Sequence, residues 1–233
     1  MKYLVFGAAG SIGGVLVRQL LSAGHQVIAA VREHHEHTGI ELLEAGAQVV
    51  VVNDVSDPGQ VRACVGSFVC RKDNLDGVVY AVGHCPPKGF PEAIKYPLSQ
   101  LPMEEYAQEI GMHQLGPLVV FQHTAGCVAD GGCFVFMSSA ITRLKGKPFP
   151  PFLHAHHHAS VIGAGDWLMD GMREDPMVAE RRIKIHRIAP AAVNTPFHDI
   201  EPRVPKMVSI ATVAERIVFA LGSPVVIDEQ LVP

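Results

Sequence analysis

Residues 2–14 read Lys2-Tyr-Leu-Val-Phe-Gly-Ala-Ala-Gly-Ser-Ile-Gly-Gly14, and this segment decides the fold of the chain. Its first part is a mainly apolar run that stops at Gly7, which predicts a strand buried on both faces. Helical periodicity follows over residues 15–21, with Gly24 as a stop signal. A strand, a glycine turn and a helix in this order form a structure in which backbone N–H groups can bind a phosphate.

Similar strand-like runs recur along the chain in alternation with helical segments. Strands are expected at residues 2–6, 26–31, 47–52, 77–83, 132–137, 183–188 and 225–227. Helices are expected at residues 61–69, 103–126 (with a bend at Gly116-Pro117), 151–172 and 209–221. This order predicts a single α/β domain over residues 1–233, a Rossmann-like, doubly wound parallel sheet of about seven strands with helices on both faces.

The composition is typical of a folded enzyme-sized domain and excludes some partners. Hydrophobic residues make up 48% of the chain and charged residues 18%, enough for a sizeable core. Lysine and arginine number 19 against 23 acidic residues, a net charge of −4, with no block of like charges. We therefore expect neither nucleic acid nor a membrane surface as a main partner, and a small molecule as the substrate.

The cysteines and the N-terminal sequence predict a cytoplasmic protein. The five cysteines are an odd number and contain no CxxC spacing, which favours reduced thiols. No signal-peptide pattern is found at the start, and no apolar run is long enough to span a bilayer.

The end of the second predicted strand indicates which nicotinamide cofactor the chain would prefer. An acidic residue there would bind the ribose hydroxyls of NAD(H), whereas this chain has Arg32. A guanidinium suits a 2′-phosphate, so NADP(H) is favoured over NAD(H). The alternative is that Arg32 is a solvated loop charge. The following histidines lie beside acidic residues, and we expect a solvated polar loop there rather than a metal site: His34, His35 and His37.

The order and spacing of these motifs resemble the short-chain dehydrogenase/reductase family over nearly the whole chain. The glycine turn resembles its nucleotide loop, Asp54-Val55 the pair that contacts adenine, and residues 189–195 the segment that clasps the nicotinamide carboxamide. Phe6, Ser11 and Tyr80 depart from the commoner family pattern. The cofactor-binding residues that the resemblance implies are Gly7, Gly10, Ser11, Ile12, Gly13, Arg32, Asp54, Val55, Gly83, Pro190, Val193 and Thr195.

The catalytic positions are where this sequence differs most from the family. The family uses Asn, Ser, Tyr and Lys, the last two in the spacing Tyr-x-x-x-Lys, and only Ser139 matches as it stands. The segment Ala159-Ser160-Val161 aligns with the residues that follow the lysine, which puts His158 at the Lys position and His154 at the Tyr position. His113 then falls at the Asn position. A register two residues earlier, with Phe152 and His156, fits the following helix less well.

The first interpretation of these histidines is proton transfer during carbonyl–alcohol redox chemistry. Histidine titrates near pH 6.5, so it can give a proton to a carbonyl oxygen at a working pH. In this interpretation Ser139 holds the substrate oxygen, His154 is the acid/base, and His158 supports it and the ribose. The expected activity rises toward mildly acidic pH.

Two other interpretations remain open at this stage. His154 and His158 are four apart on a helix and could bind one metal ion with His113, as in a metal-assisted lyase, hydratase or hydrolase, although the motif contains no carboxylate. Alternatively, the chain binds a nucleotide without catalysis, since the Tyr and Lys are missing. We expect His156 and His157 to be surface or interface residues, since they point elsewhere around the helix.

The resemblance also implies an oligomer. The family commonly pairs the helix at residues 103–126 and the histidine helix across a two-fold axis. Their apolar residues predict a homodimer or homotetramer, although packing in the core would explain them as well.

Overall fold

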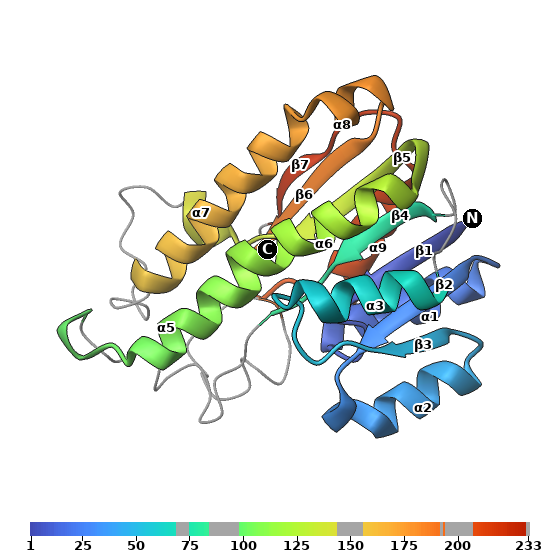
Figure 1. Cartoon of the computed structure of the whole chain (residues 1–233), viewed down its shortest axis with the longest axis horizontal. Helices are drawn as coiled ribbons and strands as arrows, with labels where there is room; N and C mark the ends of the chain where they lie inside the picture. The colour runs from blue at the N-terminus through green and yellow to red at the C-terminus, as the bar shows by residue number, and fades with distance from the viewer. Residues whose placement is uncertain (69–74, 84–97, 144–155, 192, 194–206, 232–233) are drawn as a thin grey trace.

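The computed structural model describes residues 1–68, 75–83, 98–143, 156–191, 193 and 207–231. Within them lies a seven-stranded sheet in the order β3-β2-β1-β4-β5-β6-β7, and every neighbouring pair is parallel (Figure 1). The predicted fold class is therefore confirmed. The strands are β1 Lys2–Phe6, β2 Gln26–Val31, β3 Gln48–Val51, β4 Leu75–Tyr80, β5 Val128–Met137, β6 Lys184–Pro190 and β7 Asp228–Leu231.

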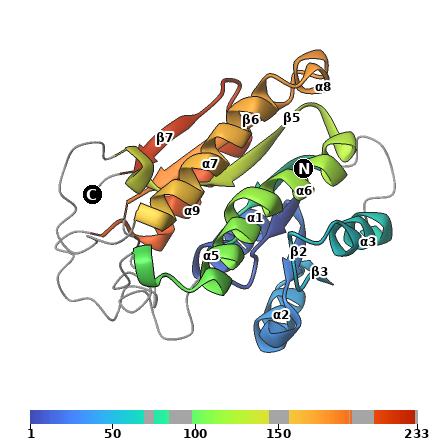
Figure 2. The same cartoon turned by 60° about the vertical axis from the view of Figure 1, so that its left-hand side comes forward.

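Helices cover both faces of this sheet, as the two views show (Figure 1, Figure 2). One face carries α1 Ser11–Ser22, α2 Glu36–Glu44 and α9 Ile210–Gly222. The opposite face carries α3 Pro58–Phe68, α5 Met103–Ile110, α6 Gly116–Thr124, α7 His156–Arg173 and α8 Pro176–Glu180. Between α5 and α6 the chain forms a π-helical segment, Gly111–Leu115, and 3-10 segments lie at Glu33–His35, Leu98–Gln100, Ala125–Cys127 and Ala140–Arg143.

The strands are apolar because each of their faces packs under a helical layer. In β1, Leu4 and Phe6 join the core on the α6 and α7 side, while Tyr3 and Val5 join the core on the α1 and α9 side. This alternation is the period of a β-strand, in which successive side chains point to opposite faces. None of the helices in the described ranges is long and apolar enough to cross a membrane.

The structure differs from the sequence-based assignment of elements in three places. The polar loop expected around His34 to His37 is instead helical, since a 3-10 turn leads into α2 at Glu36. The helix expected over residues 103–126 changes to π geometry at Gly111, before the predicted bend. The apolar run at residues 225–227 is not a strand: Val225 and Val226 are 63% and 49% exposed, and β7 begins at Asp228.

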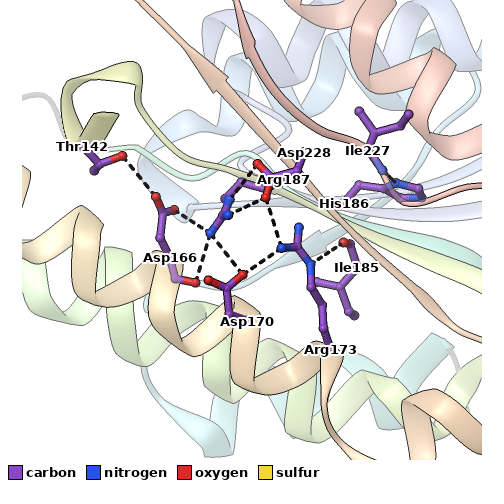
Figure 3. Close-up of polar contacts among 9 residues, drawn as sticks. All are labelled: Thr142, Asp166, Asp170, Arg173, Ile185, His186, Arg187, Ile227 and Asp228. Carbon is purple, nitrogen blue, oxygen red and sulfur yellow. Dashed lines mark hydrogen bonds and ion pairs between the residues drawn. The ribbon is translucent and has the colours of Figure 1, made fainter. Parts of the chain in front are cut away.

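A network of charged side chains fixes where β7 begins (Figure 3). The Arg187 guanidinium in β6 bonds both carboxylate oxygens of Asp228, the residue opposite it in the neighbouring strand, with Nε 3.1 Å from Oδ1. Arg173 of α7 also bonds Asp228, at 3.1 Å, and Asp170, at 2.7 Å. The ion pairs select the register in which Asp228 faces Arg187, and this outweighs the apolar run before it.

His186, the neighbour of Arg187, is a neutral hydrogen-bond acceptor for the residue directly before β7. Its ring is completely buried, and Nδ1 accepts the N–H of Ile227 at 2.9 Å (Figure 3). Burial, helped by the charges of Lys184 and Arg173, lowers the pKa of His186 to about 4. The ring therefore stays uncharged near neutral pH, which suits an acceptor inside the core.

Replacing Arg187 by alanine is expected to lower the free energy of unfolding by about 3 kcal/mol, because it leaves the buried Asp166 carboxylate without this guanidinium and removes one of the two arginine partners of Asp228. A matched control is Arg216→Ala, which breaks a pair with Glu229 of the same strand. Since the side chains of that pair are 36% and 30% exposed, its loss should cost less than about 1 kcal/mol. Urea unfolding measures both values, and equal losses would contradict a special role for Arg187.

Candidate active site

The glycine turn after β1 leaves no room for side chains. Gly7 has φ of +79°, and a Cβ there would lie 2.6 Å from the carbonyl oxygen of Ala81. A Cβ on Gly13 would lie 2.2 Å from the Gly7 oxygen. Gly10 is the N-cap residue of α1, and a glycine has no side chain that could bond the N–H groups of the first helical turn. The turn thus fits a pyrophosphate held by backbone N–H groups at a helix N-terminus.

The other predicted cofactor residues that the structure describes follow strand ends at the same edge of the sheet. Arg32 comes directly after β2 with its side chain exposed, and Ser11 is exposed at the start of α1, whereas Ile12 packs on the core. Asp54 and Val55 follow β3, Gly83 follows β4, Pro190 ends β6, and Val193 pairs with Val208. Because the carboxyl ends of parallel strands share one edge, these residues line a single side of the sheet. Thr195 lies outside the described residues.

Asp54 is held in a tight turn of its own. Its Oδ1 accepts the N–H and the hydroxyl of Ser56, at 2.8 and 2.6 Å, and its own N–H donates to Gln60. Val55 is half-buried against the core, next to Gly116. The pair predicted to contact adenine therefore lies on a hydrogen-bonded turn at the carboxyl edge of the sheet.

Glu109 of α5 is the centre of a cluster of histidines. His158 of α7 places Nδ1 at 3.3 Å from Glu109 Oε1, and His157 places Nε2 at 3.8 Å from the same oxygen. The ring of His113, from the π segment, meets that of His158 edge to face with 5.5 Å between centroids. The structure thus brings together His113 and His158, two of the residues predicted at catalytic positions, around a buried carboxylate. His154 lies outside the described residues.

The Glu109 carboxylate is held ionised by these neighbours. Only 6% of the residue is exposed. Burial raises its pKa, but the hydrogen bond with His158 and the charges of His158, His157 and His113 outweigh this and lower the pKa below its ordinary value. Its second oxygen, Oε2, is buried with no hydrogen-bond partner among the described residues. One oxygen of an ionised carboxylate therefore carries the contacts with two imidazoles.

The π segment that carries His113 has two identifiable causes. The Gly116 N–H donates to the Gly111 carbonyl, five residues earlier, and Pro117 has no N–H to offer the carbonyl of His113. Tyr80, at the end of β4, donates its hydroxyl to the Met112 carbonyl in the middle of the segment. Burial raises the pKa of Tyr80 well above its ordinary value, so the phenol remains a donor. Tyr80 thereby ties the sheet to the turn that positions His113.

Ser139 follows β5 in a turn that is bonded to α7. Its carbonyl accepts the N–H of Thr142 at 3.3 Å and lies 3.0 Å from the Thr142 hydroxyl, and that hydroxyl lies 3.1 Å from Asp166 Oδ2 (Figure 3). Arg187 donates to the Asp166 carbonyl at 3.1 Å. The network that fixes β7 therefore extends through α7 to the turn that carries Ser139.

Two residues of the cluster, His157 and Glu109, are not predicted as site residues from the sequence. His157 was expected at a surface or interface, but it is 5% exposed and faces Glu109. Glu109 itself was missed because it lies outside the histidine motif. It stands four residues before His113, a spacing that puts two side chains on one helical face, and this was the available signal. The carboxylate absent from the motif is thus supplied by a neighbouring helix.

The described residues do not support a metal site. Among them, no group of three or more His, Cys, Asp or Glu side chains is arranged to hold a metal ion. The three-histidine site considered from the sequence also needed His154, on which the structure gives no information.

The backbones of α7 and the π segment approach each other so closely at Gly165 that only a glycine is expected to fit there. A Cβ there would lie 2.2 Å from the His113 carbonyl oxygen. Gly165→Ala should therefore push α7 away from the segment and lower the free energy of unfolding by about 1–3 kcal/mol, as overpacking does. Differential scanning calorimetry and urea unfolding measure the effect.

Gly163→Ala, in the same helix, is the matched control, since a Cβ there meets no described atom within 4 Å. Helix propensity alone should make it neutral or stabilising by up to about 1 kcal/mol. Similar behaviour of the two variants would refute the close approach at Gly165.

Known proteins share this architecture. A family model described as enoyl-(acyl carrier protein) reductase matches residues 7–159. No curated protein matches the sequence.

Solved structures match over nearly the full chain at low identity. A blue fluorescent protein from a metagenomic library, solved in complex with NADPH, has a TM-score of 0.83 and 19% identity, covering 99% of this chain and 95% of its own. A short-chain dehydrogenase from Burkholderia cenocepacia J2315 in complex with NADP has a TM-score of 0.78 and 18% identity, covering 100% and 88%. Serine dehydrogenase from Escherichia coli has a TM-score of 0.78 and 18% identity, covering 100% and 98%.

Proposed function

The chain belongs to the short-chain dehydrogenase/reductase family, and on that premise we propose that it is an NADP(H)-dependent oxidoreductase acting on a carbonyl or alcohol. The observation that carries the proposal is the glycine turn, where side chains at Gly7 and Gly13 would clash with the backbone and which leads directly into the N-terminus of α1. When bound, the cofactor supplies or accepts the hydride.

The residues around the turn support a nicotinamide cofactor with a 2′-phosphate. Gly7, Gly10 and Gly13 would hold the pyrophosphate at the N-terminus of α1. Arg32 is exposed directly after β2, where its guanidinium would bind the phosphate on the ribose. Two structural neighbours were solved with NADPH or NADP, which agrees with this preference.

Titration of the purified chain with NADPH and NADH, followed by nicotinamide fluorescence, tests the proposal directly. NADPH should bind more tightly, and Arg32→Glu should weaken it by roughly 10- to 100-fold, the value of a charged hydrogen bond, with little change for NADH. The matched control is Arg182→Glu, which reverses another exposed arginine, this one between α8 and β6. Absence of NADPH binding by the wild-type protein would refute the proposal.

The catalytic part of the proposal uses histidine where the family uses tyrosine and lysine. Ser139 would hold the substrate oxygen, His154 would donate or accept the proton, and His158 and His113 would support it. The described contacts of His158 with Glu109 and His113 favour a proton-transfer role for this region.

Carbonyl reduction with saturating NADPH is expected to become faster as the pH falls through about 6.5, since histidine must be protonated to act as the acid. Initial rates over a panel of aldehydes and ketones, from about pH 5 to about pH 9, measure this dependence. A flat profile would contradict histidine as the acid. Tight NADPH binding without turnover across the panel would instead favour a nucleotide-binding protein without catalysis.

We also propose that the protein is a cytoplasmic homodimer or homotetramer. A groove of about 650 Å³ runs between α6 and α7 and includes Leu118, Phe121 and Leu168. Trp167, at its rim, is 82% exposed, which is a large apolar surface to leave in water.

The proposed cytoplasmic location is supported by two cysteines. Cys64 and Cys133 are buried, and burial raises the pKa of these thiols to about 11 and about 12, which suits inert reduced cysteines.

A further inference from the structure

We infer that Glu109 is a positioning residue that fixes the tautomer and orientation of His158, so that His158 Nε2 is a proton-exchanging atom of the active site. The observation is a buried carboxylate whose Oε1 lies 3.3 Å from His158 Nδ1. The inference rests on the proposed function and changes one part of it, because it gives the proton transfer to His158 in place of His154. It adds Glu109, a residue outside the histidine motif.

The direction of the hydrogen bond follows from the state of the carboxylate. Contacts with His158 and the other histidines lower the pKa of Glu109 despite burial, which raises it, so near neutral pH the side chain carries a charge and can only accept. A buried charge is costly unless donors satisfy it. Two ring nitrogens lie near Glu109 Oε1, Nδ1 of His158 and Nε2 of His157, and the first is nearer. His158 Nδ1 must therefore carry the proton that this oxygen accepts.

The tautomer of His158 follows from this bond. A neutral imidazole has one N–H and one lone pair, so a proton held on Nδ1 leaves the lone pair on Nε2. A carboxylate or carbonyl partner on one ring nitrogen commonly sets the chemistry of the other in this way. Glu109 thus plays for His158 the part that an orienting acid plays for a catalytic histidine.

Exposure distinguishes His158 from its neighbour. The side chains of Glu109 and His157 are 7% and 5% exposed, whereas that of His158 is 14% exposed. His157 Nε2 lies 3.8 Å from Oε1, beyond hydrogen-bond distance, and adds an ionic contact only when it is protonated. Of the two imidazoles beside Glu109, His158 is therefore the better placed to exchange a proton with a molecule outside the helix pair.

The charges that face Glu109 come from two packed elements. His157 and His158 face it from α7, and His113 faces it from the π segment. One carboxylate compensates one imidazolium, and two adjacent imidazoliums would repel each other. The single carboxylate of Glu109 therefore compensates one imidazolium of this cluster and not two.

The proton step balances within this pair. In carbonyl reduction, protonated His158 breaks its Nε2–H bond and the substrate oxygen forms an O–H bond, while the carbonyl carbon receives the hydride required by the proposed function. The ring becomes neutral and keeps its Nδ1–H on Glu109. In the reverse direction the Nε2 lone pair accepts the alcohol proton, and Glu109 stabilises the imidazolium that forms.

Nitrogen-15 NMR of the histidine rings tests the pair without any substrate. In the full-length wild-type protein, with the His158 ring in its neutral form, the ring should show a protonated Nδ1 and an unprotonated Nε2, with the signals assigned by their loss in His158→Gln. Glu109→Leu should shift the ring toward the Nε2–H form. A wild-type ring with Nε2–H, or a tautomer unchanged in Glu109→Leu, would overturn the inference.

Nearly isosteric substitutions separate positioning from folding. Glu109→Gln keeps an oxygen acceptor but removes the charge, so we expect the tautomer to persist while kcat falls at least about tenfold and the KM for NADPH stays constant. Glu104→Gln, at an exposed site of the same helix, should leave both unchanged. Equal kcat values in Glu109→Gln and the wild type would refute the role. If the tautomer is as expected but NADPH does not bind, the Glu109 pair stands and the proposed function fails.

Discussion

Parallel pairing of β1 with β2 on one side and β4 on the other is the constraint on which the rest of this structure depends. The remaining neighbouring pairs of the described sheet are parallel too, so the carboxyl ends of its seven strands lie at one edge. The connections through α1 and α2 cover one face, and the chain then crosses to the other through α3 to reach β4. The glycine turn lies where the two windings separate, which is where open parallel sheets bind their ligands.

The second requirement is a fixed distance between two backbones on the opposite face. The His113 carbonyl approaches α7 at Gly165 so closely that only a hydrogen fits between them. Tyr80 secures the same segment from the sheet through the Met112 carbonyl. His113 and His158 meet because both helices are held by backbone contacts, and contacts of this kind vary less than contacts between side chains.

Local patterns predicted the centre of the sheet well. β1 and β2 have the predicted bounds, since a short apolar run ended by a glycine or an arginine has few other solutions in a parallel sheet. The last strand was misplaced because hydrophobicity was the wrong guide at an edge. There, bonds between Arg187 and Asp228 decide the register of β7 against β6. The sequence of residues 225–231 alone does not indicate that Asp228 pairs with a residue of β6.

The site was predictable where it follows a motif and not where it depends on packing between helices. The glycine turn could be identified from its own sequence. The partnership of Glu109 with His158 joins residues 49 positions apart, on α5 and α7, and depends on how these two helices pack together. For the same reason His157 was assigned to the surface, because the position of α5 relative to α7 was unknown.

The charges at the start of β7 have a further consequence for how molecules of this protein behave toward one another. β7 is the last strand of the described sheet, and its sequence Asp228-Glu229-Gln230-Leu231 carries two carboxylates, which pair with Arg187 and Arg216. The opposite edge, β3, has the sequence Gln48-Val-Val-Val51. Charged edges resist addition of a strand from a neighbouring chain, and apolar edges invite it. At β7, the residues that set the register of the strand therefore also oppose aggregation. At β3, the short length of the strand is what limits the addition of another strand.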